Sequence, residues 1–129
     1  MLALSVRQPW AWLIVNGHKT VENRVWATNY RGPILIHASK TPGLGPNDLT
    51  GLRRELHRQC GIAIPADLPT GGIVGTVNLV DCVTECVDLV DASWHEPGQY
   101  AFILRNARPL PFQPMSGRLK FFDTHYIPR

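Results

Sequence analysis

Residues 17–26, GHKTVENRVW, bring a lysine, a carboxylate and a guanidinium together at Lys19, Glu22 and Arg24. If this segment is extended, alternate side chains share a face, so Glu22 and Arg24 point the same way as Trp26. The intervening valines then form the natural core face. The polar face offers hydrogen-bonding groups beside a flat indole ring, on which a nucleobase can stack. The simpler alternative is a solvated strand edge with a surface ion pair.

Further polar residues are expected to converge on this face. Arg7 and Gln8 end the first predicted strand, while His37 and Ser39 share a face near the end of another. Polar groups that collect where strands meet a helix can line a binding pocket. A hydrogen-bonded structural role remains the alternative for His37. We therefore predict a nucleobase-binding pocket formed by Arg7, Gln8, Arg24, Trp26, His37 and Ser39.

The same segment also suits a small hydrolytic site. Lysine can act as a base when burial or nearby positive charge lowers its pKa, and Arg7 and Arg24 would supply such charge near Lys19. Glu22 would then orient Lys19, and Thr20 or a water molecule would attack the substrate. The sequence contains no G-x-S-x-G, P-loop or G-x-G-x-x-G motif. The catalytic candidates are therefore Lys19, Glu22 and Thr20, and binding without catalysis remains open.

Two helices are expected beside these residues. Pro9 suits the first turn of a short apolar helix, and Gly17 suits the position just past its end. Such a helix must be largely buried. A second, amphipathic helix begins after a cap at Asn47 or Asp48 and ends at Gly61.

The remaining segments indicate strands. Gly75 marks a bulge or a barrel bend within the longest of them. A turn is expected over residues 93–98, and we treat Trp94 and His95 within it as surface residues. This pattern predicts an α+β fold with a small, mostly antiparallel β-barrel and two or more flanking helices. The predicted strands span residues 2–6, 20–26, 32–40, 71–90, 99–111 and 118–126.

Length and composition predict a single domain over residues 1–129. The 129 residues are 44% hydrophobic, which is enough for one core. No apolar run approaches the roughly 20 residues of a membrane helix, and no signal-peptide cleavage site is visible. We therefore expect no membrane partner and a cytoplasmic location. The net charge is +3, with basic residues prevailing in 1–40 and acidic ones in 81–96, which would turn an anionic partner toward the first 40 residues.

The cysteines predict neither a disulfide framework nor a metal site. There are three, Cys60, Cys82 and Cys86, and an odd number argues against complete pairing. The C-x3-C spacing is a poor match to the usual zinc motifs. Reduced, buried thiols are the expected state, and we predict no metal and no cofactor.

The run LSVRQPWAWLIVNGHKTVENRVWATNYRGPILIHASK closely resembles the ASCH domain family of the PUA-like superfamily, in its bacterial and phage members. The family signature G-x-K-x-x-E-x-R is complete as Gly17, Lys19, Glu22 and Arg24. The resemblance implies a PUA-like β-barrel with helices beside it and a cleft where the signature residues gather. It also implies RNA or modified-nucleobase recognition, with RNA or a modified nucleoside as the partner.

Other members of the family imply further activities. Some bacterial ASCH proteins are amidohydrolases that deacetylate N4-acetylcytidine, and their signature lysine corresponds to Lys19. Their nucleophile is a threonine three positions later, where this chain has Glu22. Their catalytic glutamate comes from a later segment, for which Glu85 and Glu96 are the candidates.

Two more alternatives stay open. Other relatives are ribonucleases that use a lysine with a tyrosine and a serine, and here the serine would be Ser39 or Ser116. The last alternative is a regulatory protein-interaction domain, in which the acidic stretch 81–96 meets a basic partner.

Overall fold

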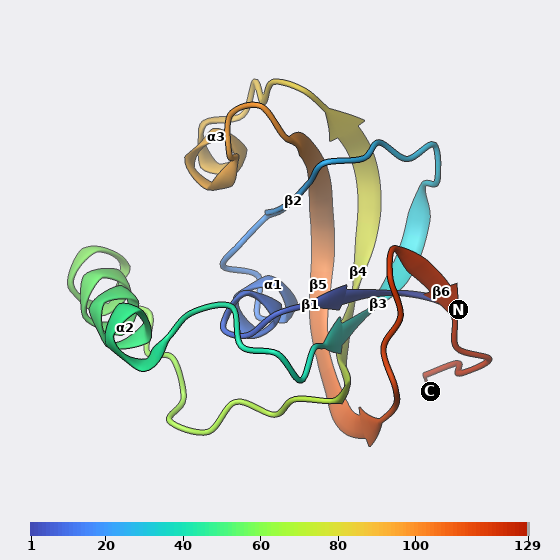
Figure 1. Cartoon of the computed structure of the whole chain (residues 1–129). Helices are drawn as coiled ribbons and strands as arrows, with labels where there is room; N and C mark the ends of the chain where they lie inside the picture. The colour runs from blue at the N-terminus through green and yellow to red at the C-terminus, as the bar shows by residue number, and fades with distance from the viewer. Residues whose placement is uncertain (129) are drawn as a thin grey trace.

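Six strands form one sheet that curls into a half-barrel in the computed structural model, which describes residues 1–128 (Figure 1). The strand order is β2-β5-β4-β3-β1-β6. Only β1 and β3 run parallel, and the other neighbours are antiparallel. The predicted α+β fold is therefore confirmed. The strands are β1 (Leu2–Val6), β2 (Val21–Arg24), β3 (Gly32–Ala38), β4 (Gly72–Val83), β5 (Tyr100–Pro114) and β6 (Phe121–Asp123).

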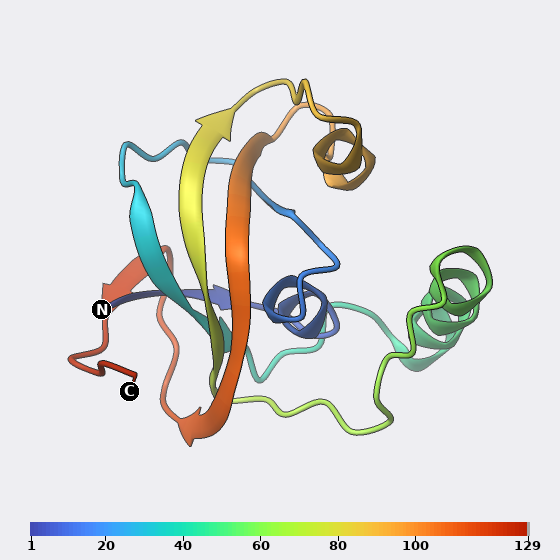
Figure 2. The same ribbon diagram turned by 180° about the vertical axis from the view of Figure 1, so that it is seen from behind.

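Three helices accompany the sheet, and they lie at different distances from it. The helices are α1 (Trp10–Val15), α2 (Pro46–Cys60) and α3 (Leu89–Trp94). Helix α1 lies against the sheet, whereas α2 stands well to one side of it in both views (Figures 1 and 2). Within residues 1–128, every helix is too short or too polar to span a membrane.

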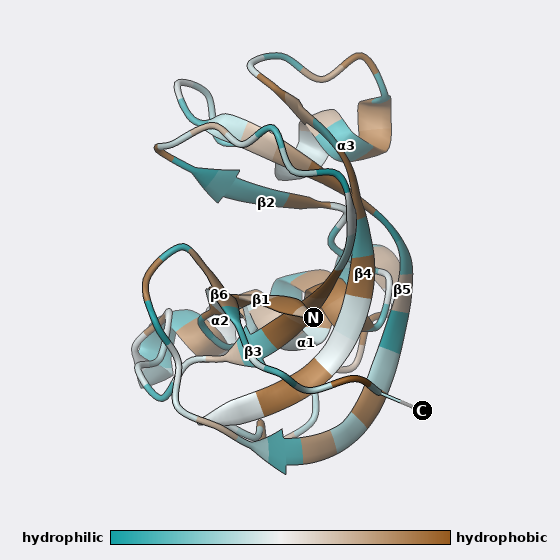
Figure 3. Ribbon diagram, turned by 90° about the vertical axis from the view of Figure 1, so that its right-hand side faces the viewer, coloured by the Kyte–Doolittle hydropathy of each residue, from teal (hydrophilic) through white to brown (hydrophobic). Residues whose placement is uncertain are grey.

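The core fills the concave side of the sheet. Apolar side chains from α1 and from β1, β3, β4 and β5 form its main cluster. The hydropathy colouring shows strongly apolar segments along β4 and β5, whereas β2 is largely hydrophilic (Figure 3). Helix α1 approaches β4 so closely that a Cβ at Gly75 would lie 2.5 Å from Val15 Cγ1. The register between β4 and β5 also shifts between Ile73 and Gly75, which confirms the predicted bulge.

Several predicted boundaries are wrong, for local reasons. The predicted strand 71–90 ends at Val83, and Leu89 and Val90 begin a helix instead, because Asp88 caps it: the Asp88 side chain accepts a hydrogen bond from Asp91 N. The predicted cap at Asn47 or Asp48 is also wrong, since Gly45 precedes the helix and Pro46 occupies its first position. Strand β6 is only three residues long, not nine, and β5 extends to Pro114. Gly61, with φ +68°, does end α2 as expected.

Helix α3 is clamped over the outer end of the sheet by a buried carboxylate. Asp91 is 4% exposed and accepts two hydrogen bonds from Arg105 of β5, at 3.0 and 2.7 Å. Thr20 Oγ1 donates a third, at 2.7 Å. The Arg105 guanidinium holds the pKa of Asp91 below its usual value. These contacts fix α3 and the loop after it beside β2.

Candidate functional site

A cleft of about 1310 Å³ opens between edge strand β2 and the end of β1. Two segments that are distant in sequence complete its walls: residues 93–96 at the end of α3, and residues 115–120 between β5 and β6. Strand β6 pairs with β1 only at Leu2, Ala3 and Leu4. Ser5 and Val6 therefore extend beyond β6 and face the cleft.

The turn after α1 carries Lys19 into the interior. Gly17 adopts φ +79°, and the amides of His18 and Lys19 both donate to Leu13 O, at 2.9 and 3.0 Å. This reversal points Lys19 back along the cleft floor, where the residue is only 6% exposed. Its Nζ donates to the carbonyl oxygen of Val21 and lies 5.9 Å from the centre of the Trp10 ring.

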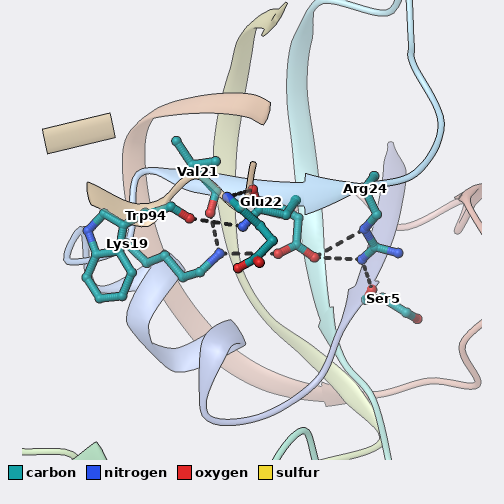
Figure 4. Close-up of polar contacts among 8 residues, drawn as sticks. Ser5, Lys19, Val21, Glu22, Arg24 and Trp94 are labelled. Carbon is teal, nitrogen blue, oxygen red and sulfur yellow. Dashed lines mark hydrogen bonds and ion pairs between the residues drawn. The ribbon is translucent and has the colours of Figure 1, made fainter. Parts of the chain in front are cut away.

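Glu22 links the two cations of the signature. Its Oε1 lies 3.4 Å from Lys19 Nζ, and its Oε2 accepts from Arg24 Nε at 3.2 Å and Arg24 Nη2 at 2.8 Å. Arg24 Nη2 also donates to Ser5 O at 2.5 Å, which ties β2 to β1 across the cleft. Figure 4 shows Lys19 and Arg24 reaching Glu22 from opposite sides. The simpler reading of a solvated strand edge is therefore wrong, since Glu22 is 9% exposed.

Burial controls the electrostatics of this floor. Desolvation lowers the pKa of Lys19 below its usual value; Glu22 opposes that effect, and Arg24 adds to it. With Lys19 protonated, the three groups carry one net positive charge, because one carboxylate faces two cations. The floor can therefore hold a hydrogen-bond acceptor or a single negative charge without a further counter-ion.

His37 and Ser39 lie on the cleft wall, as the predicted shared face requires. His37 is 2% exposed; its Nε2 lies 2.6 Å from Met115 O, and its Nδ1 lies 2.9 Å from Ser5 Oγ. Since a carbonyl oxygen only accepts, Nε2 carries a hydrogen, and in the neutral ring Nδ1 accepts from Ser5. His37 thus joins β1, β3 and the segment 115–120.

Arg7 and Trp26 also line the cleft, but the surroundings of Trp26 differ from the expectation. Strand β2 ends at Arg24, so Val25 is 81% exposed instead of facing the core. The Trp26 ring packs edge-on against Phe102 and Phe121, with centroids 5.1 and 5.4 Å away. It is therefore a half-buried wall of the cleft and not a fully exposed platform.

Gln8 and Thr20 do not line the cleft, although both were candidates for the site. Gln8 is buried; its Oε1 accepts from Trp12 N at 2.9 Å, and its Nε2 donates to Pro69 O at 3.0 Å. The Thr20 hydroxyl is directed to Asp91. In both cases the polar atoms satisfy the protein's own backbone or side chains, so neither residue is placed to touch a ligand in the cleft.

Sequence analysis missed residues that reach the cleft from far along the chain. Asn23 is the link to one group: its Nδ2 donates to Trp94 O at 3.0 Å, and its Oδ1 accepts from Glu96 N at 2.8 Å. Trp94 is half-buried, so treating it as a surface residue was wrong. The sequence did offer one indication of this role, because Trp94 is a large aromatic residue in an otherwise acidic turn.

The second missed group is the segment 115–120, which carries Arg118 and Lys120. Lys120 Nζ lies 5.6 Å from the centre of the Trp26 ring. Within residues 1–128, no three His, Cys, Asp or Glu side chains are grouped for metal binding.

Comparison with known proteins identifies the family of this chain. The model of the ASCH domain family matches residues 4–112. Activating signal cointegrator 1 from Homo sapiens and from Mus musculus are 34% and 33% identical to this chain over 126 residues, which is 92% of the chain. The chain spans 21% of the length of each of these curated relatives.

Solved structures show the same fold. The crystal structure of ASCH from Zymomonas mobilis aligns with a TM-score of 0.55 at 19% identity, covering 88% of this chain and 72% of that chain. A single-residue variant of that protein aligns with a TM-score of 0.52 at 18% identity, covering 88% and 74%.

Proposed function

The chain belongs to the ASCH domain family, and from that premise we propose that its cleft recognises RNA or a modified nucleobase. The observation that carries the proposal is the ion-paired triad of buried Lys19 and Glu22 with half-buried Arg24, on the floor of a cleft with aromatic walls. These are the residues of the G-x-K-x-x-E-x-R motif. Single-stranded RNA is commonly read by stacking a base and hydrogen-bonding its edge, which needs both kinds of group in one place.

The triad keeps hydrogen-bonding capacity after its internal contacts. Arg24 Nε donates to Glu22, and Arg24 Nη2 donates to both Glu22 and Ser5 O. Within residues 1–128, Arg24 Nη1 has no hydrogen-bond partner. Lys19 uses two of its three donors. The Lys19 and Arg24 donors can bind the ring nitrogen and carbonyl oxygen of a base edge, and the Glu22 carboxylate between them can accept from an exocyclic amine on the same edge. Cytosine has this combination.

A binding titration tests the proposal. Fluorescence anisotropy with a short labelled single-stranded RNA should show that Lys19→Ala/Arg24→Ala binds at least about tenfold more weakly, since a hydrogen bond to a charged group contributes about 1.5–3 kcal/mol. The matched control is Arg54→Ala/Arg58→Ala, which removes the same charge from exposed positions on α2. Equal affinity for wild type and the Lys19/Arg24 variant would refute the proposal. Because Glu22 then loses both partners, circular dichroism must show that this variant is folded.

The second candidate is an amidohydrolase acting on N4-acetylcytidine-type nucleosides, and the depressed pKa of Lys19 favours it. Neutral Lys19 would take a proton from water while the resulting hydroxide attacks the acyl carbon. The Lys19 ammonium would then protonate the departing exocyclic N4 amine as the C–N bond breaks, which yields cytidine and acetic acid and returns Lys19 to its neutral form; the acetic acid then ionises to acetate. Thr20 would take no part, because its hydroxyl is bonded to Asp91.

Turnover of N4-acetylcytidine, followed by release of acetate, tests this alternative. Activity in wild type that disappears in Lys19→Met supports it, while no turnover, or turnover that survives the substitution, refutes it. Of the later glutamates, Glu96 lines the cleft and Glu85 does not. Ser39 and Ser116 both line it, so the ribonuclease alternative is tested in parallel by looking for cleavage of the labelled RNA.

A further inference from the structure

The positive charge of the molecule is concentrated at the cleft. Six of the 13 Lys and Arg residues line it, but only two of the ten Asp and Glu residues do. The cleft therefore carries a formal charge of +4 with His neutral, while the whole chain carries +3. The remainder of the chain is slightly acidic. Such a focused potential attracts an anion to this face in particular.

The cations divide into a floor and a rim. Lys19 and Arg24 form the floor and share Glu22. Four exposed cations form the rim, and in residues 1–128 none of them has an ion-pair partner. Unpaired surface cations of this kind neutralise phosphates at little desolvation cost. The rim consists of Arg7, Lys40, Arg118 and Lys120.

The segment that supplies half of the rim is docked at defined points. Met115 O receives the His37 Nε2 hydrogen bond at 2.6 Å. Gly117 packs directly on the Ser5–His37 pair, because a Cβ there would lie 2.6 Å from Ser5 Oγ and 2.7 Å from His37 Cε1. Lys120 in turn lies over Trp26. The segment 115–120 thus holds Lys120 over the aromatic wall and carries Arg118 on the same cleft.

We propose that the rim binds the sugar–phosphate backbone, so that the cleft binds a nucleotide within an RNA strand more tightly than a free nucleoside, with Arg118 and Lys120 as phosphate-binding residues. This inference rests on the proposed function. The floor would read the base, whereas the rim would bind the strand without regard to its sequence.

Salt dependence separates the two layers. Each phosphate contact on a single strand contributes about 0.7 to the slope of log affinity against log salt concentration. Arg118→Ala/Lys120→Ala should therefore bind the labelled single-stranded RNA with a slope that is shallower by about 1.4. The affinity of the same variant for free cytidine, measured by calorimetry, should stay equal to that of wild type, because a nucleoside has no phosphate.

The control is again Arg54→Ala/Arg58→Ala, which should leave the slope unchanged. An unchanged slope in the Arg118/Lys120 variant, or an equal reduction in the control, overturns the inference and leaves the proposed function standing. The two failures can be told apart. If Lys19→Ala/Arg24→Ala loses RNA binding while Arg118→Ala/Lys120→Ala keeps the wild-type salt slope, only the inference about the rim is overturned. A wild-type chain that binds no RNA overturns both.

Discussion

Replacing Glu22 by Gln is the sharpest perturbation of the floor. The carboxylate accepts hydrogen bonds at 3.4 Å from Lys19 and at 3.2 and 2.8 Å from Arg24. Glutamine keeps the shape but has no charge, and it turns an amide N–H₂ toward one of the two cations. Lys19, 6% exposed, then becomes a buried ammonium without a counter-ion.

The expected loss follows from the burial of the three groups. Removing one partner of a buried ion pair costs about 3–5 kcal/mol of unfolding free energy. The side chain of Arg24 is 22% exposed and can recover some hydration. We therefore expect Glu22→Gln to lose about 3 kcal/mol at neutral pH, at the lower end of that range.

The loss should depend on pH, with a sign set by Lys19. Burial lowers the pKa of Lys19 in the folded chain below its unfolded value of 10.5. Between those two values the unfolded chain binds more protons, so stability rises with pH in that window. Without Glu22 the pKa of Lys19 in the folded chain falls further, so the pH range over which stability rises extends to lower pH. The difference between wild type and Glu22→Gln should therefore shrink as the pH rises toward 10.5.

Urea unfolding followed by tryptophan fluorescence measures both effects. The matched control is the same substitution in a Lys19→Met background, where no ammonium needs compensation; there it should cost clearly less and show no such dependence on pH. A cost below about 1 kcal/mol at neutral pH, which is the range of exposed pairs, would refute this account. So would an equal cost in the Lys19→Met background.

Three further predictions concern the residues that hold the site in place. Asp91→Asn should cost about 2 kcal/mol of unfolding free energy in urea, since Arg105 loses a charged partner. Because the folded pKa of Asp91 is lowered, the stability that Asp91 contributes is present above its unfolded pKa of 3.8 and is lost as the pH falls through the folded pKa. The variant should therefore lack this acid-dependent loss of stability. Gly75→Ala should cost about 1–3 kcal/mol or more, because the new Cβ would meet Val15 Cγ1 at 2.5 Å, and an unchanged unfolding midpoint would contradict it. Thr20→Val should cost about 1 kcal/mol through the lost bond to Asp91 and leave RNA affinity unaltered; weaker RNA binding with the fold intact would return Thr20 to the site.

Local chemistry made part of this molecule predictable. Gly17 does reverse the chain after α1 with a positive φ, and alternation does place Glu22 and Arg24 together, because both effects act within a few residues. Alternation predicts the direction of side chains only within the strand. Strand β2 ends at Arg24, so Val25 turns outward and Trp26 packs on two phenylalanines.

The long-range parts of the site had no such local signal. Thr20 and Asp91 are 71 positions apart, and only the folded chain shows that the Thr20 hydroxyl donates to the Asp91 carboxylate of α3. The β-branched residues at 87 and 90 favour a strand by propensity, and the capping carboxylate of Asp88 outweighs them. The position of the segment 115–120 depends on His37, which lies on another strand.

The central claim is that the ion-paired triad of Lys19, Glu22 and Arg24 forms the RNA-binding floor of this ASCH domain. An anisotropy titration of short single-stranded RNA against wild type, Lys19→Ala/Arg24→Ala and Arg54→Ala/Arg58→Ala tests it most directly. The account predicts a loss of at least about tenfold for the first variant and a much smaller loss for the second. Equal affinities for the two variants would contradict it.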